Sequence, residues 1–184
     1  MLPRRSFLAA AAVFALPVAV RAAGMEGQAM GLRPNAAEDQ TRAFQRAVEA
    51  AAGARLPLRL QPGTYRVGEV RLPAFAQIVG VRGATRLIFQ GGQACLSAVR
   101  ADQVTLSGLT IEGAGRALPE RQGLISLARG RGVRIEDCEV TGASQNGMML
   151  TEIEGLVSGN TVTGAAKGGI FALDSRGLTI SRNV

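Results

Sequence analysis

The chain has 184 residues, 47% of them apolar, so it is long enough to bury a core of its own. Its formal net charge is +7, but the arginines are scattered and no basic run is interleaved with aromatic residues, so nucleic acid is not an expected partner. There are 24 glycines and no histidine, and the two cysteines lie far apart. This composition suits a fold of tight turns and gives no indication of a metal site.

The N-terminal segment has the pattern of a secretory signal peptide. Arg4 and Arg5 precede Phe7 and Leu8, and the short apolar stretch that follows falls below the ~20 residues a membrane-spanning helix needs. The arginine pair resembles a twin-arginine signal, which exports folded proteins; an ordinary secretory signal with two arginines is the alternative. We expect residues 1–22 to be this signal, the twin-arginine translocase to be a partner during export, and the protein to be periplasmic or extracellular with no stable membrane span.

Residues 23–34 are expected to form a linker and residues 35–53 a helix. An apolar stripe recurs at helical spacing, acidic residues stand in the expected first turn, and Gly53 is expected to end the helix in the left-handed conformation. A helix of this kind can cover the apolar end and the unpaired strand edges of a solenoid. The stripe consists of Phe44, Ala47, Val48 and Ala51, and the acids are Glu38 and Asp39.

From residue 54 apolar residues alternate with polar ones, with a period of two. Further along, a sequence motif recurs about every 22 residues. The segment 133–142 is echoed by 156–164, and 178–184 begins a third copy. A fixed period built from short strands and glycine turns predicts a β-solenoid with three short strands in each turn. The bend position that repeats is held by Cys138, Asn160 and Asn183. We expect a partial hydrogen-bonded ladder there, with left-handed backbone angles that asparagine tolerates.

Residues 36–48, followed by Leu58-Arg59-Leu60-Gln61-Pro62-Gly63-Thr64-Tyr65, resemble the opening of pectate-lyase-like right-handed parallel β-helix proteins. Together with the two N-terminal arginines, the likeness is closest to exported bacterial repeat proteins that are uncharacterised. The resemblance implies an all-β fold, a single-stranded right-handed parallel β-helix over residues 54–184 with an N-terminal helical cap. It does not identify a reaction, because such folds include lyases, glycosidases, epimerases and surface proteins.

Two acids are candidates for catalysis. Glu152 and Asp174 are 22 residues apart and follow matching strands, so they should stack on adjacent turns about 4.8 Å apart. Stacked carboxylates can share a proton, bind calcium or flank a glycosidic bond. Lys167 is the candidate substrate-binding neighbour. The alternative reading, that both acids are solvated turn residues, stays open, and it applies equally to the acids at 136, 137 and 139.

Two further expectations concern the interior. Ile125, Met149 and Phe171 occupy matched strand positions and are expected to be core residues rather than an outer apolar groove. Cys95 and Cys138 fall at different positions of the repeat, so we expect two buried thiols rather than a disulfide.

The leading functional hypothesis is an exported β-helix protein that is carbohydrate-associated, a polysaccharide lyase or glycoside hydrolase if it is catalytic. The alternative is a non-catalytic envelope or surface protein that binds glycans or scaffolds a partner. The Asn-Thr-Asp, Asp-Asp and His-Gly motifs of related polygalacturonate-cleaving glycosidases are missing. Because the last repeat breaks off at Val184, we expect a longer protein whose catalytic turns follow. No cofactor is indicated, with calcium the one to expect for a lyase.

Overall fold

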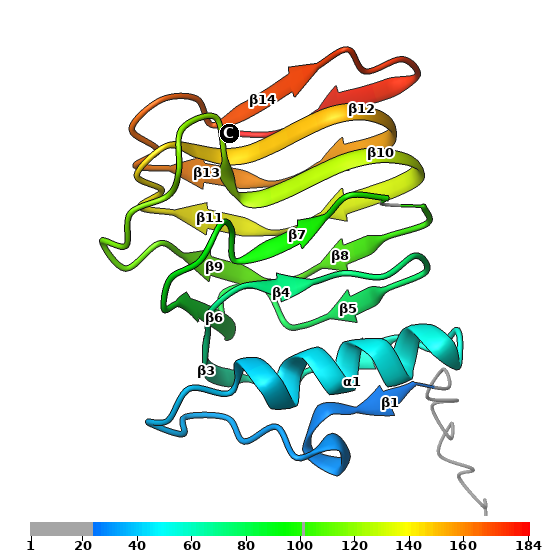
Figure 1. Cartoon of the computed structure of the whole chain (residues 1–184), viewed down its shortest axis with the longest axis vertical. Coiled ribbons are helices and arrows are strands. Elements are labelled where there is room, and N and C mark those ends of the chain that lie inside the picture. Colours follow the sequence, from blue (N-terminus) through cyan, green and yellow to red (C-terminus); the bar gives the residue numbers. More distant parts are fainter. Residues whose placement is uncertain (1–23, 101) are drawn as a thin grey trace, which may run out of the picture.

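The computed structural model describes residues 24–100 and 102–184, which form a right-handed parallel β-helix with a helix across its N-terminal end (Figure 1). This confirms the predicted fold class. Each regular turn contributes strands to three faces, and every strand pair is parallel because the chain travels in the same direction on each turn.

The first face is the one that carries the candidate site described below. Its strands are β4 (Val70–Arg71), β7 (Leu96–Ala98), the first halves of β10 (Gly123–Glu136) and β12 (Asn146–Ser158), and β14 (Ile170–Leu173).

The second face contains the later halves of β10 and β12, which bend round a corner and so serve two faces each. Its other strands are β2 (Leu58–Arg59), β5 (Gln77–Val79), β8 (Thr105–Ser107) and β15 (Leu178–Ser181). The corner shows as a register shift between Gly130 and Val133 opposite β12. Gly155 has φ +152° there, and a side chain at this position would overlap the carbonyl oxygen of Val133. Only glycine fits this bend.

The third face is a separate five-stranded sheet. Its strands are β3 (Gly63–Val67), β6 (Thr85–Phe89), β9 (Thr110–Glu112), β11 (Glu139–Thr141) and β13 (Thr161–Thr163).

The core consists of apolar side chains that stack in columns along the solenoid axis. On the second face the strand register aligns Leu58, Ile78, Leu106, Ile135 and Val157, all fully buried. Side chains alternate along each strand, so the polar residues between the apolar ones point outside. The same register from turn to turn therefore keeps apolar residues over apolar residues through the whole stack. This is why the period of the sequence predicts the fold.

The N-terminal cap is helix α1 (Thr41–Gly53), whose predicted apolar stripe is buried. The ring of Phe44 meets that of Tyr65 edge to face, with centroids 6.4 Å apart. Gln45 fastens the helix to the sheet edge: its Nε2 donates to the carbonyl of Arg71 and its Oε1 accepts from the Arg71 N–H, both at 2.8 Å. The side chain of Gln45 thus satisfies an edge strand that would otherwise be unpaired.

The helix begins at Thr41 and not at Asn35. The residues before it pair with β3 instead: Asn35 N–H donates to the carbonyl of Thr64, and Asp39 forms a parallel bridge with Arg66. Glu38 and Asp39 therefore precede the helix, where the Asp39 carboxylate accepts from the Thr41 N–H at 2.8 Å. Tertiary pairing has overridden the local helical pattern.

The helix ends at Gly53, but the left-handed residue is Arg55, with φ 53°. The guanidinium of Arg55 lies 4.0 Å from the centroid of the Phe75 ring, within the range of a cation–π contact. The expected linker also contains structure, with β1 (Met25–Glu26) pairing with β2 and a 3-10 turn, η1 (Gly27–Met30), after it. Within the described residues, no helix has the length and apolarity to cross a membrane.

The bend between the second and third faces contains hydrogen bonds that run from turn to turn. Asn160 Oδ1 accepts from the Cys138 N–H at 2.9 Å, and Asn183 Oδ1 accepts from the Asn160 N–H at 2.9 Å. Asn160 Nδ2 also donates to the carbonyl of Ile135. The expected left-handed residue is displaced by one position: Asp137, Gly159 and Arg182 have positive φ, each directly before the ladder residue.

Candidate functional site

The outward side of the first face carries two apolar side chains beside a cavity. The strand register aligns Ser126, Met149 and Phe171, whereas Ile125 aligns with Met148 in the core. Phe171 is 46% exposed. The expectation of core positions is therefore confirmed for Ile125 and wrong for Phe171, while Met149, 9% exposed, lies on the outward side with Phe171. The alignment was one residue out for Ile125, and a slip of one residue moves a side chain to the opposite face.

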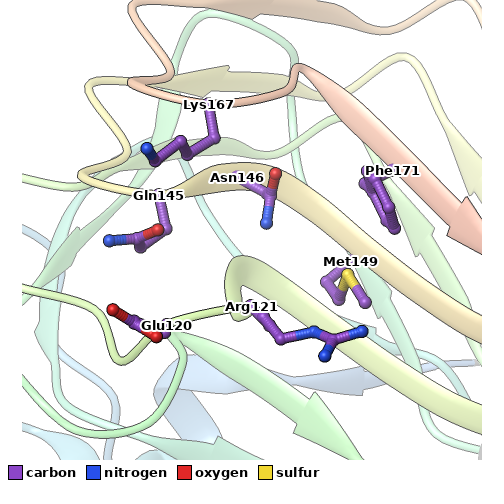
Figure 2. Close-up of a pocket in the computed structure, with 7 residues that line it drawn as sticks. All are labelled: Glu120, Arg121, Gln145, Asn146, Met149, Lys167 and Phe171. Atoms are coloured by element: carbon purple, nitrogen blue, oxygen red, sulfur yellow. The ribbon is translucent and has the colours of Figure 1, made fainter.

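The cavity has a volume of about 430 Å³, and two loops contribute to it together with the strands β12 and β14. Figure 2 shows Met149 and Phe171 on one side of the cavity, and Glu120, Gln145 and Lys167 on the other. Hydrogen-bonding groups thus face an apolar surface, which is the usual composition of a small-molecule or carbohydrate site. The lining residues are Glu120, Arg121, Gln145, Asn146, Met149, Lys167 and Phe171.

Asn146 joins the two loops that carry the polar groups. Its Nδ2 donates to the carbonyl of Gln122 at 3.1 Å, and its Oδ1 accepts from the Gly168 N–H at 3.1 Å. One loop brings Glu120 and Arg121, and the other brings Lys167. Because Asn146 is itself buried, it fixes the separation of these loops across the cavity.

A second hollow of about 580 Å³ continues along the first face toward the cap. Arg121 and Met149 line both hollows, so the two form one surface, which we call the outer groove. Further along it, Glu69 accepts from Ser97 Oγ at 3.0 Å and lies 3.5 Å from Arg71 Nε. These contacts occupy the Glu69 carboxylate.

Two cations of the outer groove make no such contacts. Among the described residues, Arg121 and Lys167 take part in no hydrogen bond of their side chains and no ion pair. Both are exposed. Their charge is therefore available to a ligand.

Glu152 and Asp174 lie elsewhere, at the corner where the first face turns into the second. The pairing of Thr151 with Leu173 places the two acids on adjacent turns, and both line a depression of about 930 Å³. Both are exposed and have positive φ, 54° and 51°. Arg129 and Arg176 line the same depression, so the acids lie among arginines.

Lys167 is separated from these acids. It precedes β14, whereas Asp174 follows that strand, and the two residues line different cavities. The repeat alignment did not reveal this separation. Lys167 and Asp174 are only seven positions apart in the sequence, but they lie at opposite ends of β14. No group of three or more His, Cys, Asp or Glu within residues 24–100 and 102–184 is arranged to hold a metal ion.

The acids at the bend between the second and third faces are bound to arginines. Arg82 Nε lies 3.3 Å from Glu139 Oε1 and Arg82 Nη1 lies 3.7 Å from Asp137 Oδ1. Glu136 pairs with Arg134 on its own strand at 2.8 Å. Behind these contacts, burial raises the pKa of the Cys138 thiol to about 12. Burial has the same effect on Cys95, which precedes β7 on the first face and whose pKa is also raised to about 12. Both thiols are neutral and buried.

Comparison with known proteins agrees with this architecture. The model of the right-handed beta helix region matches residues 88–184, more than half of the chain. The chain belongs to the right-handed β-helix family. No curated protein matches its sequence.

Two solved β-helix structures are similar to this family member. One is a candidate glycosyl hydrolase from Parabacteroides merdae ATCC 43184, with a TM-score of 0.70 and 15% identity over 88% of this chain and 97% of that one. The other is the Agl-KA catalytic domain, with a TM-score of 0.60 and 15% identity over 90% of this chain but 38% of that one. At this identity the likeness shows the fold.

The polar residues of this β-helix site were missed from the sequence, apart from Lys167. Glu120, Arg121 and Gln145 stand just before a strand of the first face and Asn146 begins one, whereas the sequence prediction rested on acids that follow each strand. The same repeat alignment places Gln145 opposite Lys167, and the Lys167 N–H donates to the Gln145 carbonyl at 3.0 Å. The signal was therefore present in the spacing.

Proposed function

We propose that this β-helix protein binds a polysaccharide in the outer groove. The observation that carries the proposal is the exposed ring of Phe171 beside Met149, opposite the cations and amides around Asn146. A sugar ring presents an apolar face of C–H groups and a rim of hydroxyls. A surface that pairs an aromatic ring with hydrogen-bonding groups complements both.

Two independent features support this reading. The outer groove extends over several turns, as a polymeric ligand requires, and it is open along its length. The solved structures with the same fold include proteins whose names refer to glycosyl hydrolase and catalytic activity. A compact metabolite would instead favour an enclosed cavity.

We further propose that the protein cleaves the bound polysaccharide, as a hydrolase or a lyase. Glu120 is the carboxylate of the cavity beside Phe171, with Arg121 and Lys167 in the same lining. A hydrolase of the two-carboxylate kind needs a second acid about 5–9.5 Å away, whereas a lyase needs one base. Glu120→Gln should therefore retain glycan binding and abolish the release of cleaved oligosaccharides. Unchanged cleavage would remove Glu120 from the reaction, and binding without cleavage by the wild type would favour the non-catalytic alternative.

Binding is tested by affinity electrophoresis against a panel of neutral and acidic polysaccharides. Phe171→Ala should lower the affinity for the polysaccharide about tenfold, because an exposed aromatic contact contributes on the order of 1–2 kcal/mol. Val81→Ala is the matched control, since Val81 is 50% exposed but lies in the turn after β5 of the second face. Equal losses in the two variants would contradict a site at Phe171.

The acid pair at the corner is a second candidate for chemistry, favoured by its stacked carboxylates. Glu152→Gln and Asp174→Asn test it in the same cleavage assay. If the pair is catalytic, either substitution abolishes cleavage while the groove still binds glycan. If both variants cleave normally, the two acids are solvated turn residues and the catalytic proposal is confined to the outer groove.

We also propose that the protein is exported by the twin-arginine route. The supporting feature is the pair Arg4 and Arg5 before Phe7 and Leu8, which lie outside the described residues. Replacing both arginines with lysine should leave the protein in the cytoplasm in a cell fractionation experiment. An ordinary secretory signal would tolerate that change, because lysine retains the positive charge.

A further inference from the structure

A third hollow lies between the cap and the first face. It has a volume of about 540 Å³ and is formed by the outward side of α1 and by the edge strand β4. Gln45, through its two hydrogen bonds to the backbone of Arg71, holds the helix against this strand. The hollow is therefore a fixed feature of the way the cap attaches. Its lining residues are Thr41, Arg42, Gln45, Arg46, Glu49, Glu69 and Arg71.

This hollow is continuous with the outer groove. Glu69 and Arg71 line both, just as Arg121 and Met149 join the two hollows of the groove itself. The strands from β4 to β14 are separated by four strand spacings, which is about 19 Å along the solenoid axis. A single extended ligand can therefore run from Phe171 at one end to α1 at the other, over the strands seen in Figure 1.

The charges in this hollow are not balanced. Glu49 accepts a hydrogen bond from Gln45 Nε2 at 2.9 Å, and the contacts of Glu69 with Ser97 and Arg71 are described above. Arg42 and Arg46, four residues apart and so on the same side of the helix, are exposed. In the described part of the chain neither has an ion-pair partner. Three arginines and two acids line the hollow, so positive charge is in excess there.

We propose that Arg42 and Arg46 form a subsite for an anionic group of the polysaccharide, such as the carboxylate of a uronic acid. We call it the cap subsite. The ligand is then an acidic polysaccharide that lies along the solenoid axis, with one part on Phe171 and another at the helix. This inference rests on the proposed function, since it extends the same groove. It gives α1 a role in binding in addition to covering the end of the solenoid.

The test uses oligogalacturonates of increasing length as probes and the double variant Arg42→Gln/Arg46→Gln. The long oligomers should lose affinity about tenfold, because two exposed charge contacts are removed. The shortest oligomers fill only the cavity at Phe171 and should bind the variant and the wild type equally. The difference at long lengths should shrink as salt is raised, because exposed charges are screened.

A matched control removes the same charge elsewhere. Arg66 and Arg116 are exposed and line no part of the groove, the adjoining hollow or the corner depression, so Arg66→Gln/Arg116→Gln should leave every affinity unchanged. An equal loss in both double variants would mean that only net charge matters and would overturn the cap subsite. Full affinity of Arg42→Gln/Arg46→Gln, with a loss in Phe171→Ala, would overturn the cap subsite and leave the groove intact. No binding of any oligomer or neutral polysaccharide by the wild type would contradict the proposed function itself.

Discussion

The bend between the second and third faces and the outer groove use their charged side chains in opposite ways. At the bend, Arg82 reaches across turns to Asp137, Glu139 and Thr161, and its Nη1 donates to the Gly159 carbonyl at 2.7 Å. In the groove and the adjoining hollow, the cations Arg42, Arg46, Arg121 and Lys167 contact no acid within the described residues.

The difference separates the polar residues that stabilise the solenoid from those that are available to bind a ligand. Polar groups that bond to the next turn stabilise the stack, and they are satisfied without a ligand. Polar groups that lie beside an exposed aromatic ring add nothing to the stack and are open to a partner. Substitutions at the bend should therefore change stability, and substitutions in the groove should change binding.

At neutral pH, the largest expected effect is at the ladder. Asn160→Ala leaves the Cys138 N–H and the Ile135 carbonyl without their partners in a buried bend. The free energy of unfolding should fall by about 3 kcal/mol, from one to three for each unsatisfied group. Urea denaturation measures this, with the exposed Thr163→Ala as control. A loss below about 1 kcal/mol would mean that the ladder contributes little.

The next effect concerns the thiols that lie beneath the two regions. Burial raises the pKa of both Cys95 and Cys138 to about 12, above the value of about 8.5 expected in the unfolded chain. Between these values the unfolded state loses protons that the folded state keeps, so stability falls as pH rises from 9 toward 12. The slope is about 1.4 kcal/mol per pH unit for each thiol. The double variant Cys95→Ala/Cys138→Ala should lose the part of this dependence that comes from the thiols and keep the part from Tyr65, whose pKa burial also raises. An unchanged slope would contradict the assignment.

Asn146 gives the matching experiment within the groove. Asn146→Ala releases the loop of Arg121 from the loop of Lys167, and glycan affinity should fall about fivefold because the polar groups are no longer held in place. The comparison is Asn160→Ala, measured where both variants remain folded. That variant should bind glycan normally, and a similar loss of affinity in both would show that binding follows general stability.

The smallest effect is expected for the ion pairs at the bend. Arg82→Ala should lower stability by about 1 kcal/mol, and less at high salt, because these charges are partly exposed. Arg116→Ala is the control, an exposed arginine that has no ion pair among the described residues. If Arg116→Ala costs as much as Arg82→Ala, the contacts of Arg82 across the turns do not stabilise the stack.

Much of the fold was predictable from the sequence, because a solenoid repeats one local rule. The 22-residue period, the glycines and the apolar columns such as Leu106–Ile135–Val157 all follow from strand alternation. The start of α1 was not predictable from local pattern, since Asn35 and Asp39 are recruited by β3. A pairing partner that lies later in the chain decides that boundary.

The site was harder to predict for a related reason. Whether an apolar strand residue lies inside or outside depends on register to a single residue, and Ile125 was aligned with Met149 instead of Met148. The polar residues come from loops of unequal length before β10, β12 and β14, whose course over the first face is not encoded in the strand period. Only the corner acids, which directly follow strands, and the pair Gln145 and Lys167 were accessible to spacing alone.

The account is tested most directly by hydroxyl-radical footprinting with and without an oligogalacturonate, read out residue by residue. We predict that the ligand protects the exposed Phe171 from oxidation, and that Ile180 and Val81, which are 45% and 50% exposed outside the groove, react equally in both samples. Protection confined to the corner of Glu152 and Asp174, or equal protection at Ile180, would contradict the claim that the outer groove is the ligand-binding surface.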